Sequence, residues 1–149
     1  MAKSVTKEYE KDFYAWTVHN AKLLREGKLF EIDIEHIAEK IESMGKSEKR
    51  ELINRLAVLI AHLLKWQFQP ERQSNSWKYT IEEQRDEVLE LIEESPSLKY
   101  EIQDKLDRAY KKAILWAATE MGVNKSIFQD KCPFSLEEVL NKNFYPENK

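Results

Sequence analysis

The three histidines of the chain are the first residues to test for chemistry, because helical proteins often hold metal ions with histidine and carboxylate side chains. None of them (His19, His36 and His62) follows a glutamate by three positions, so the sequence lacks the Glu-x-x-His pairs of a di-iron site. The His-Glu-x-x-His pattern of zinc hydrolases is absent as well. We expect Asp33 and His36 to form a solvated pair in the first turn of a helix, and we predict no metal site and no cofactor.

Nucleophilic and phosphate-binding chemistry has as little support in the sequence. Cys132 is the single cysteine; Pro133 follows it, and no histidine lies near it in the chain. Gly27, Gly45 and Gly122 are isolated from one another, so they form no glycine-rich phosphate loop, and each is expected to end a helix. The sequence therefore identifies no catalytic residue and favours a protein that is not an enzyme.

Cations alternate with aromatic residues between positions 62 and 85, which is a pattern of single-stranded nucleic-acid binding. The same stretch holds four cations against three acids, and its net charge of +1 does not make a basic patch. Folding would have to gather more cations on one face. The residues that would then contact nucleic acid are Lys46, Lys49, Arg50, Lys65, Arg72 and Lys78.

A sharper signal comes from polar residues that fall on apolar helix faces. On helical wheels Asn20, Gln67, Arg85 and Glu120 each lie among apolar side chains. A buried charge without a partner costs several kcal/mol, a large part of the stability of a whole domain. Such residues therefore pair with one another or reach water.

Antiparallel neighbouring helices would bring several of these residues to one end of the fold. We predict a partly buried polar cluster there, made of Gln67, Arg72, Arg85 and Glu120 and walled by Trp66, Trp77 and Trp116. The cluster is either a binding site for a small ligand or a structural network that sets the register of the helices. Fraying at the helix ends, which would expose Gln67 and Glu120, is a third interpretation.

Helices must position these residues, because glycine and proline are scarce and apolar residues recur at helical spacing. We expect one all-α domain over residues 1–149, a bundle of five to six helices, with its core over about 8–142 and a flexible tail over about 143–149. Phe144 and Tyr145 are candidates to pin that tail. The predicted helices span about 8–26, 33–44, 48–68, 77–94, 96–121 and 135–142.

The helix predicted over residues 48–68 should be the central element. Its apolar residues cover half of the helix circumference, which requires contact with two or more other helices. A narrow polar stripe opposite them holds Glu51, Arg55, His62, Lys65 and Gln69. Ser47 is expected to cap this helix and Pro70 to end it.

Charge and hydropathy disfavour several classes of protein. The net charge of −3 provides no general attraction to nucleic acid or acidic lipid, and the acid-rich stretch 86–107 should repel phosphate. The longest apolar run, residues 56–61, is far shorter than the roughly 20 residues that a membrane span needs. One cysteine forms no internal disulfide, and the amino terminus lacks the apolar core of a signal peptide. We expect a cytoplasmic protein without membrane contact.

Short segments along the chain form a recognisable combination. They are residues 9–16 (YEKDFYAW), 41–50 (IESMGKSEKR), 62–72 (HLLKWQFQPER), 76–77 (SW), 84–85 (QR), 95–98 (SPSL), 132–134 (CPF) and 144–146 (FYP). Together they resemble a bacterial family known as domain of unknown function family 29, which is common in cyanobacteria, over nearly the whole chain. The resemblance implies an all-helical fold and carries no established activity, cofactor or catalytic residue. The loop of similar proteins looks more basic than this one, where Gln73 and Asn75 are neutral.

Three functions follow from these observations. The first is a non-enzymatic interaction or adaptor protein that associates with itself or with an unknown protein partner through wide apolar surfaces. The second is a nucleic-acid-associated protein that uses the basic and aromatic face. The third is a small-ligand binder or enzyme that uses the polar cluster at the 67–77 end.

Overall fold

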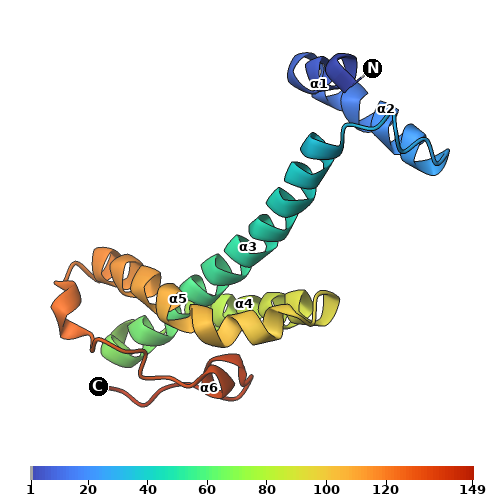
Figure 1. The fold of residues 1–149 in the computed structure, drawn as a ribbon. Helices are drawn as coiled ribbons and strands as arrows, with labels where there is room; N and C mark the ends of the chain where they lie inside the picture. The colour runs from blue at the N-terminus through green and yellow to red at the C-terminus, as the bar shows by residue number, and fades with distance from the viewer. Residues whose placement is uncertain (1) are drawn as a thin grey trace. The chain divides into compact units, whose positions relative to one another are not determined.

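The computed structural model describes the backbone of residues 2–149 and the side chains of residues 7–149, and within them every regular element is a helix (Figure 1). The all-α prediction is confirmed. In chain order the elements are α1 (Ala2–Lys11), α2 (Phe13–Arg25), α3 (Ile34–Phe68), the short 3-10 helix η1 (Pro70–Arg72), α4 (Asn75–Glu94), α5 (Leu98–Met121), the 3-10 helix η2 (Lys125–Ile127) and α6 (Leu136–Leu140).

The helices form two compact units, an amino-terminal unit (Met1–Ser47) and a carboxyl-terminal unit (Glu48–Lys149). Helix α3 contributes its first part to one unit and its second part to the other. The assignment of residues 1–149 to one domain, with a core over about 8–142 and a flexible tail, stays a prediction.

The first predicted helix, residues 8–26, is divided in two at Asp12. The Asp12 backbone is not helical (φ −147°, ψ 83°), and its side chain accepts a hydrogen bond from the Ala15 amide at 3.0 Å. Aspartate at this position satisfies an amide at the start of α2, and this local bond competes with a continuous helix. The expected end before Gly27 is correct, because Gly27 adopts the left-handed conformation (φ 72°).

Helix α3 runs through Gly45 for 35 residues, so the predicted helix end at Gly45 and the predicted cap at Ser47 are wrong. Gly27 and Gly122 have positive φ angles, whereas Gly45 keeps a helical backbone. A glycine inside a helix costs only about 1 kcal/mol relative to alanine, which the hydrogen bonds on both sides of it offset.

The second part of α3 is the centre of the carboxyl-terminal core. Leu56, Ala57, Leu59 and Ile60 are fully buried there. Ala109, Ala113 and Ala117 follow one another at four-residue spacing along α5 and are fully buried too, and small side chains let helices approach closely. Further core residues are Ile81 and Val88 from α4 and Ile102 from α5.

The ends of the remaining helices lie close to their predicted positions. Ser74, and not Ser76, caps α4 by accepting from the Trp77 amide at 3.3 Å. The capping box predicted at residues 135–138 is present, because Ser135 and Glu138 each accept a hydrogen bond from the other's amide. Gly122 ends α5 with φ 68°. Within the described residues, we find no helix with the length and apolar content that a membrane crossing requires.

Candidate functional site

Arg85 on α4 is the most deeply buried charged residue that the structure describes, with 1% of its surface exposed. Its Nε donates to the Val139 carbonyl at 2.8 Å, and its Nη2 donates to the Phe144 carbonyl at 2.7 Å. Two longer contacts of 3.5 Å reach the carbonyls of Glu138 and Lys142. One guanidinium therefore fastens the chain from α6 into the tail against α4.

The tail makes further contacts with the end of α3. The Tyr145 ring packs on Trp66, with ring centres 4.9 Å apart, and lies 5.5 Å from the Arg85 guanidinium. Gln73 donates to the Trp66 carbonyl at 2.9 Å and to the Asn148 side chain at 3.0 Å. Burial lowers the pKa of Arg85, and Tyr145 opposes that shift. Phe144 and Tyr145, the two candidates from the sequence to pin the tail, both pack against the core.

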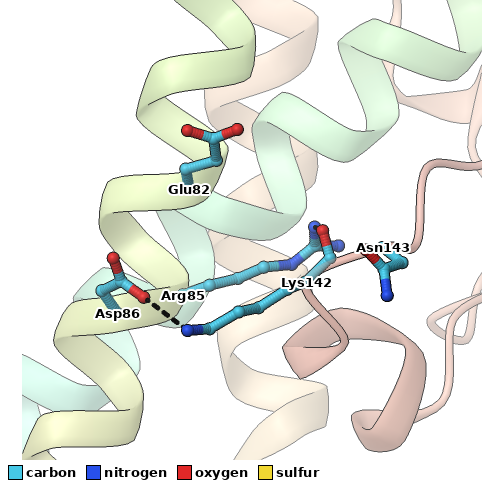
Figure 2. A pocket seen from close by; sticks show the side chains of 5 residues that line it. All are labelled: Glu82, Arg85, Asp86, Lys142 and Asn143. Atoms are coloured by element: carbon cyan, nitrogen blue, oxygen red, sulfur yellow. Dashed lines mark hydrogen bonds and ion pairs between the residues drawn. The ribbon is translucent and has the colours of Figure 1, made fainter.

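An open polar cavity of about 340 Å³ lies beside Arg85 and the start of the tail (Figure 2). Its lining residues are Glu82, Arg85, Asp86, Lys142 and Asn143. Figure 2 shows the side chains of Arg85 and Lys142 running next to each other from opposite sides, with the Lys142 amine pointing at Asp86. That ion pair spans 3.5 Å between two exposed side chains, so solvent screens it. Two carboxylates and two cations make the lining neutral in sum.

Lys65 on α3 is also buried, and it forms an ion pair with Glu120 on α5. The Lys65 ammonium also lies 4.9 Å from the centre of the Trp77 ring, and this cation–π contact stabilises its charge. One turn earlier, His62 donates from Nδ1 to the Val58 carbonyl at 2.9 Å. Burial lowers the pKa of His62, and the charge of Lys65 lowers it further. These contacts join α3, α4 and α5.

The predicted polar cluster is thus divided between two sets of contacts. Trp66 and Arg85 contact the tail, whereas Trp77 and Glu120 contact Lys65. Arg85 donates to backbone carbonyls of α6 and the tail, whereas Glu120 takes Lys65 as its partner. Arg72 is exposed in η1, the Gln67 carbonyl accepts from the Lys149 amide at 2.8 Å, and Trp116 is exposed. A binding role for this group stays a prediction.

The residues predicted to contact nucleic acid are unequally available. Lys65 is buried and paired with Glu120, and Lys49 pairs with Glu101 at 3.3 Å. Lys46, Arg50 and Lys78 are exposed. Lys46 belongs to the amino-terminal unit, and the other cations belong to the carboxyl-terminal unit.

A polar network in the amino-terminal unit was only partly expected from the sequence. Asn20, which the wheel had placed on an apolar face, donates to the Trp16 carbonyl at 3.0 Å and accepts from the Asp33 amide at 2.9 Å. The Trp16 indole donates to Asp33 Oδ2 at 3.0 Å. Asn20 therefore ties α2 to the start of α3.

His36 completes this network. Its Nδ1 lies 2.7 Å from Asp33 Oδ2 and must donate, because an ionised carboxylate only accepts. The ring stacks on Tyr9 with centres 3.8 Å apart. The expectation of a solvated pair is wrong, since the Asp33 side chain is 5% exposed and accepts from the Trp16 indole as well as from His36. Burial acts to raise the pKa of Asp33, but the hydrogen bonds from His36 and Trp16 bring it below its usual value.

Neither network has the composition of a metal site. Within the described residues, no group of three or more His, Cys, Asp or Glu side chains is placed to hold a metal ion. Cys132 is half-buried, and burial raises the pKa of its thiol to about 11. Little thiolate forms at neutral pH, so Cys132 is a weak nucleophile.

Large apolar side chains are exposed mostly in the amino-terminal unit. Of the sixteen large apolar residues with exposed side chains within residues 7–149, nine lie between positions 13 and 44. They are Phe13, Tyr14, Val18, Leu24, Leu29, Phe30, Ile34, Ile41 and Met44.

The fold and these contacts define an all-α protein whose buried polar groups hold its own chain together. Its family follows from the sequence model for the domain of unknown function DUF29, which matches residues 8–145, so the chain belongs to this family. The matched residues belong to both units, as do the short segments of the chain that resemble the family. Comparisons with curated proteins and with solved structures found no match. Family membership assigns no specific activity.

Proposed function

We propose that the chain is a non-enzymatic interaction protein that binds a protein partner through the apolar surface of its amino-terminal unit. The observation that carries this proposal is the concentration of exposed large apolar residues in that unit. Exposed apolar patches on soluble proteins mark interaction sites, because water contact with them is unfavourable. Phe30, Tyr14 and Met44 are the most exposed of these residues.

The use of the buried polar groups supports a non-enzymatic role. Arg85 donates to backbone carbonyls, Lys65 pairs with Glu120, and Asp33 accepts from Trp16 and His36. Each group is occupied by contacts that hold helices or the tail in place, whereas a catalytic group faces a site where substrate can reach it. The half-buried Cys132, with its raised pKa, fits the same interpretation.

Co-isolation of partners on the tagged full chain tests the proposal. Ile41→Glu places a charge in the exposed apolar surface, and Leu115→Glu is the matched control, since Leu115 is similarly exposed on α5. We expect the wild type and Leu115→Glu to retain a bound protein, whether another copy or a different chain, and Ile41→Glu to lose it. Equal recovery by both variants contradicts the proposal.

A bacterial origin and a cytoplasmic location are part of the proposal. The resemblance supports the former, and a free cysteine in a chain without a cysteine partner is compatible with a reducing compartment. A nucleic-acid-associated function has weaker support, because Lys65 and Lys49 are already paired with carboxylates. Binding to single-stranded DNA that weakens steeply with salt would revive it.

The cavity beside Arg85 supports a second candidate function, the binding of a small polar molecule. Glu82 and Asp86 repel an anion, and Arg85 and Lys142 repel a cation. A zwitterion of amino-acid size, which carries both charges, is therefore the chemical class that fits the cavity. Thermal unfolding with each free amino acid is the test. We expect one of them to raise the midpoint of the wild type and not that of Asp86→Asn, and unchanged midpoints throughout would eliminate this candidate.

A further inference from the structure

Residues 41–48 of α3 are exposed on every side of the helix. All of them are solvent-exposed, and a stretch of this length makes more than two helical turns, so no described residue covers any face of the helix there. Ile41 is 64% exposed and Met44 68% exposed, although both are apolar. This part of α3 therefore lacks the packing against described residues on which most helices in proteins depend for their stability.

Polar contacts hold both ends of this stretch and leave its middle without any. On the amino-terminal side, the Lys40 amine lies 4.7 Å from the centre of the Phe13 ring. At the other end, the Ser95 hydroxyl donates to Glu48 at 3.1 Å. Between them, within the part of the chain whose side chains are described, the side chains of residues 41–47 make no hydrogen bond, ion pair or aromatic contact.

The composition of the stretch weakens the helix further. Gly45 is a poor helix former, because glycine regains the most backbone freedom when a helix opens. Ser43 and Ser47 compete with the helix, since serine side chains bond to nearby backbone groups in non-helical conformations. A Cβ added to Gly45 meets no atom of the described residues within 4 Å, so no contact requires glycine there. The sequence is therefore weakest in helix formers where the packing is absent.

We propose that α3 opens locally at Gly45, so that residues 43–47 form a hinge between its two packed parts. In the open state the helical hydrogen bonds of the hinge are replaced by bonds to water, while the network around Asp33 and the core around Leu56 stay folded. The amino-terminal unit, which carries most of the exposed apolar side chains, then changes its direction without unfolding. The inference goes beyond the proposed function, because the hinge opens whether or not a partner binds.

Native-state hydrogen exchange of the full chain, followed residue by residue by NMR, tests the hinge. We expect the amides of residues 45–48 to be the least protected of α3 outside its terminal turns, with protection rising toward residues 37–40 and toward residues 56–64. Uniform protection along α3 overturns the inference. Protection that falls steadily from residue 64 to residue 37 overturns it as well, because the amino-terminal unit then opens as a whole.

Two substitutions in the hinge should shift its opening in opposite directions. After correction for intrinsic exchange rates, Gly45→Ala should slow the exchange of amides 45–48 about fivefold, and Ser47→Gly should speed it about twofold, because alanine favours a helix and glycine disfavours it. The amides of residues 56–64 are the internal control, and their exchange should be unchanged in both variants. Equal changes in the hinge and in the control amides, or no change in the hinge, contradict the proposal.

Gly45→Pro breaks the helix permanently and imitates the open state. Proline removes a helical amide and clashes with the preceding turn, so circular dichroism should show the loss of about one or two helical turns. The amides of residues 56–64 should keep their protection, and the indole resonance of Trp16, which donates to Asp33, should keep its position. Loss of either would show that this part of α3 supports the packed units, which would overturn the hinge.

Discussion

The two parts of α3 use similar apolar residues in opposite ways. Ile60, in the carboxyl-terminal unit, has no exposed surface, whereas Ile41, in the amino-terminal unit, is 64% exposed. Both are isoleucines in the same continuous helix, and both belong to amphipathic patterns. The difference teaches that an apolar stripe specifies a surface to be covered and does not specify whether the same chain covers it.

The polar groups of the two units differ in a similar way. In the carboxyl-terminal unit Arg85 recruits a distant segment of chain through carbonyls more than fifty residues away. In the amino-terminal unit Asp33 accepts hydrogen bonds from Trp16 and His36, which lie no more than 17 residues from it in the sequence. The carboxyl-terminal contacts therefore depend on long-range folding, and the amino-terminal contacts are more local.

The largest expected contrast is between Ile60→Ala and Ile41→Ala. Truncating the fully buried Ile60 should lower the free energy of unfolding by about 2–5 kcal/mol, since it leaves a cavity in the core. Truncating the exposed Ile41 should change the free energy of unfolding by less than about 0.5 kcal/mol. Urea unfolding of both variants provides the measurement. Similar losses would show that the amino-terminal unit covers its own apolar surface.

A smaller effect is expected for Arg85→Ala. The substitution leaves buried carbonyls of the tail without their donor, and the free energy of unfolding should fall by about 2–3 kcal/mol. Lys142→Ala is the control, because its ion pair is exposed and contributes little. Urea unfolding measures the stability, and hydrogen exchange of residues 141–149 reports release of the tail. A tail that stays protected in Arg85→Ala would disprove the role of Arg85 as its anchor.

The smallest expected effect is a pH dependence in the amino-terminal unit. The pKa of Asp33 is lower in the folded chain than its usual value, so its contribution to stability is present above that usual value and is lost as the pH falls through the folded one. The indole N–H resonance of Trp16, which donates to Asp33, should shift over this acidic range. Asp33→Asn should remove the shift, and a shift that persists in this variant would assign the titration to another group.

Much of the fold was accessible from the sequence, because helices are specified by residues close to one another. Apolar periodicity located α4, α5 and the buried part of α3, and Ser135 with Glu138 identified the last helix. Errors arose where two local signals compete. Gly45 is compatible with a helix end or a helix interior, and Asp12 with a helix or a new cap.

The candidate sites were less accessible, since polar partners are chosen over long distances in the chain. The wheels identified Asn20, Arg85 and Glu120 as polar residues that need partners, and the structure supplies a partner for each. The acceptors of Arg85 are backbone carbonyls, which every residue carries, so no pattern of side chains in the sequence identifies them. The Asp33–His36 pair is contacted by Trp16 from α2, which donates to Asp33, and by Tyr9 from α1, which stacks on His36, and a helical wheel of one element includes neither ring.

The sequence by itself determined an all-α protein, the apolar face of α3 and the residues whose polarity conflicts with their position. Spacings of three and four residues suffice for this, because they place side chains on one face of a helix. Only the tertiary structure decided which partners those residues take and which part of the apolar face stays open. Both outcomes depend on segments far apart in sequence that come together only when the whole chain packs, and the exposed apolar residues at the start of α3 are part of that result.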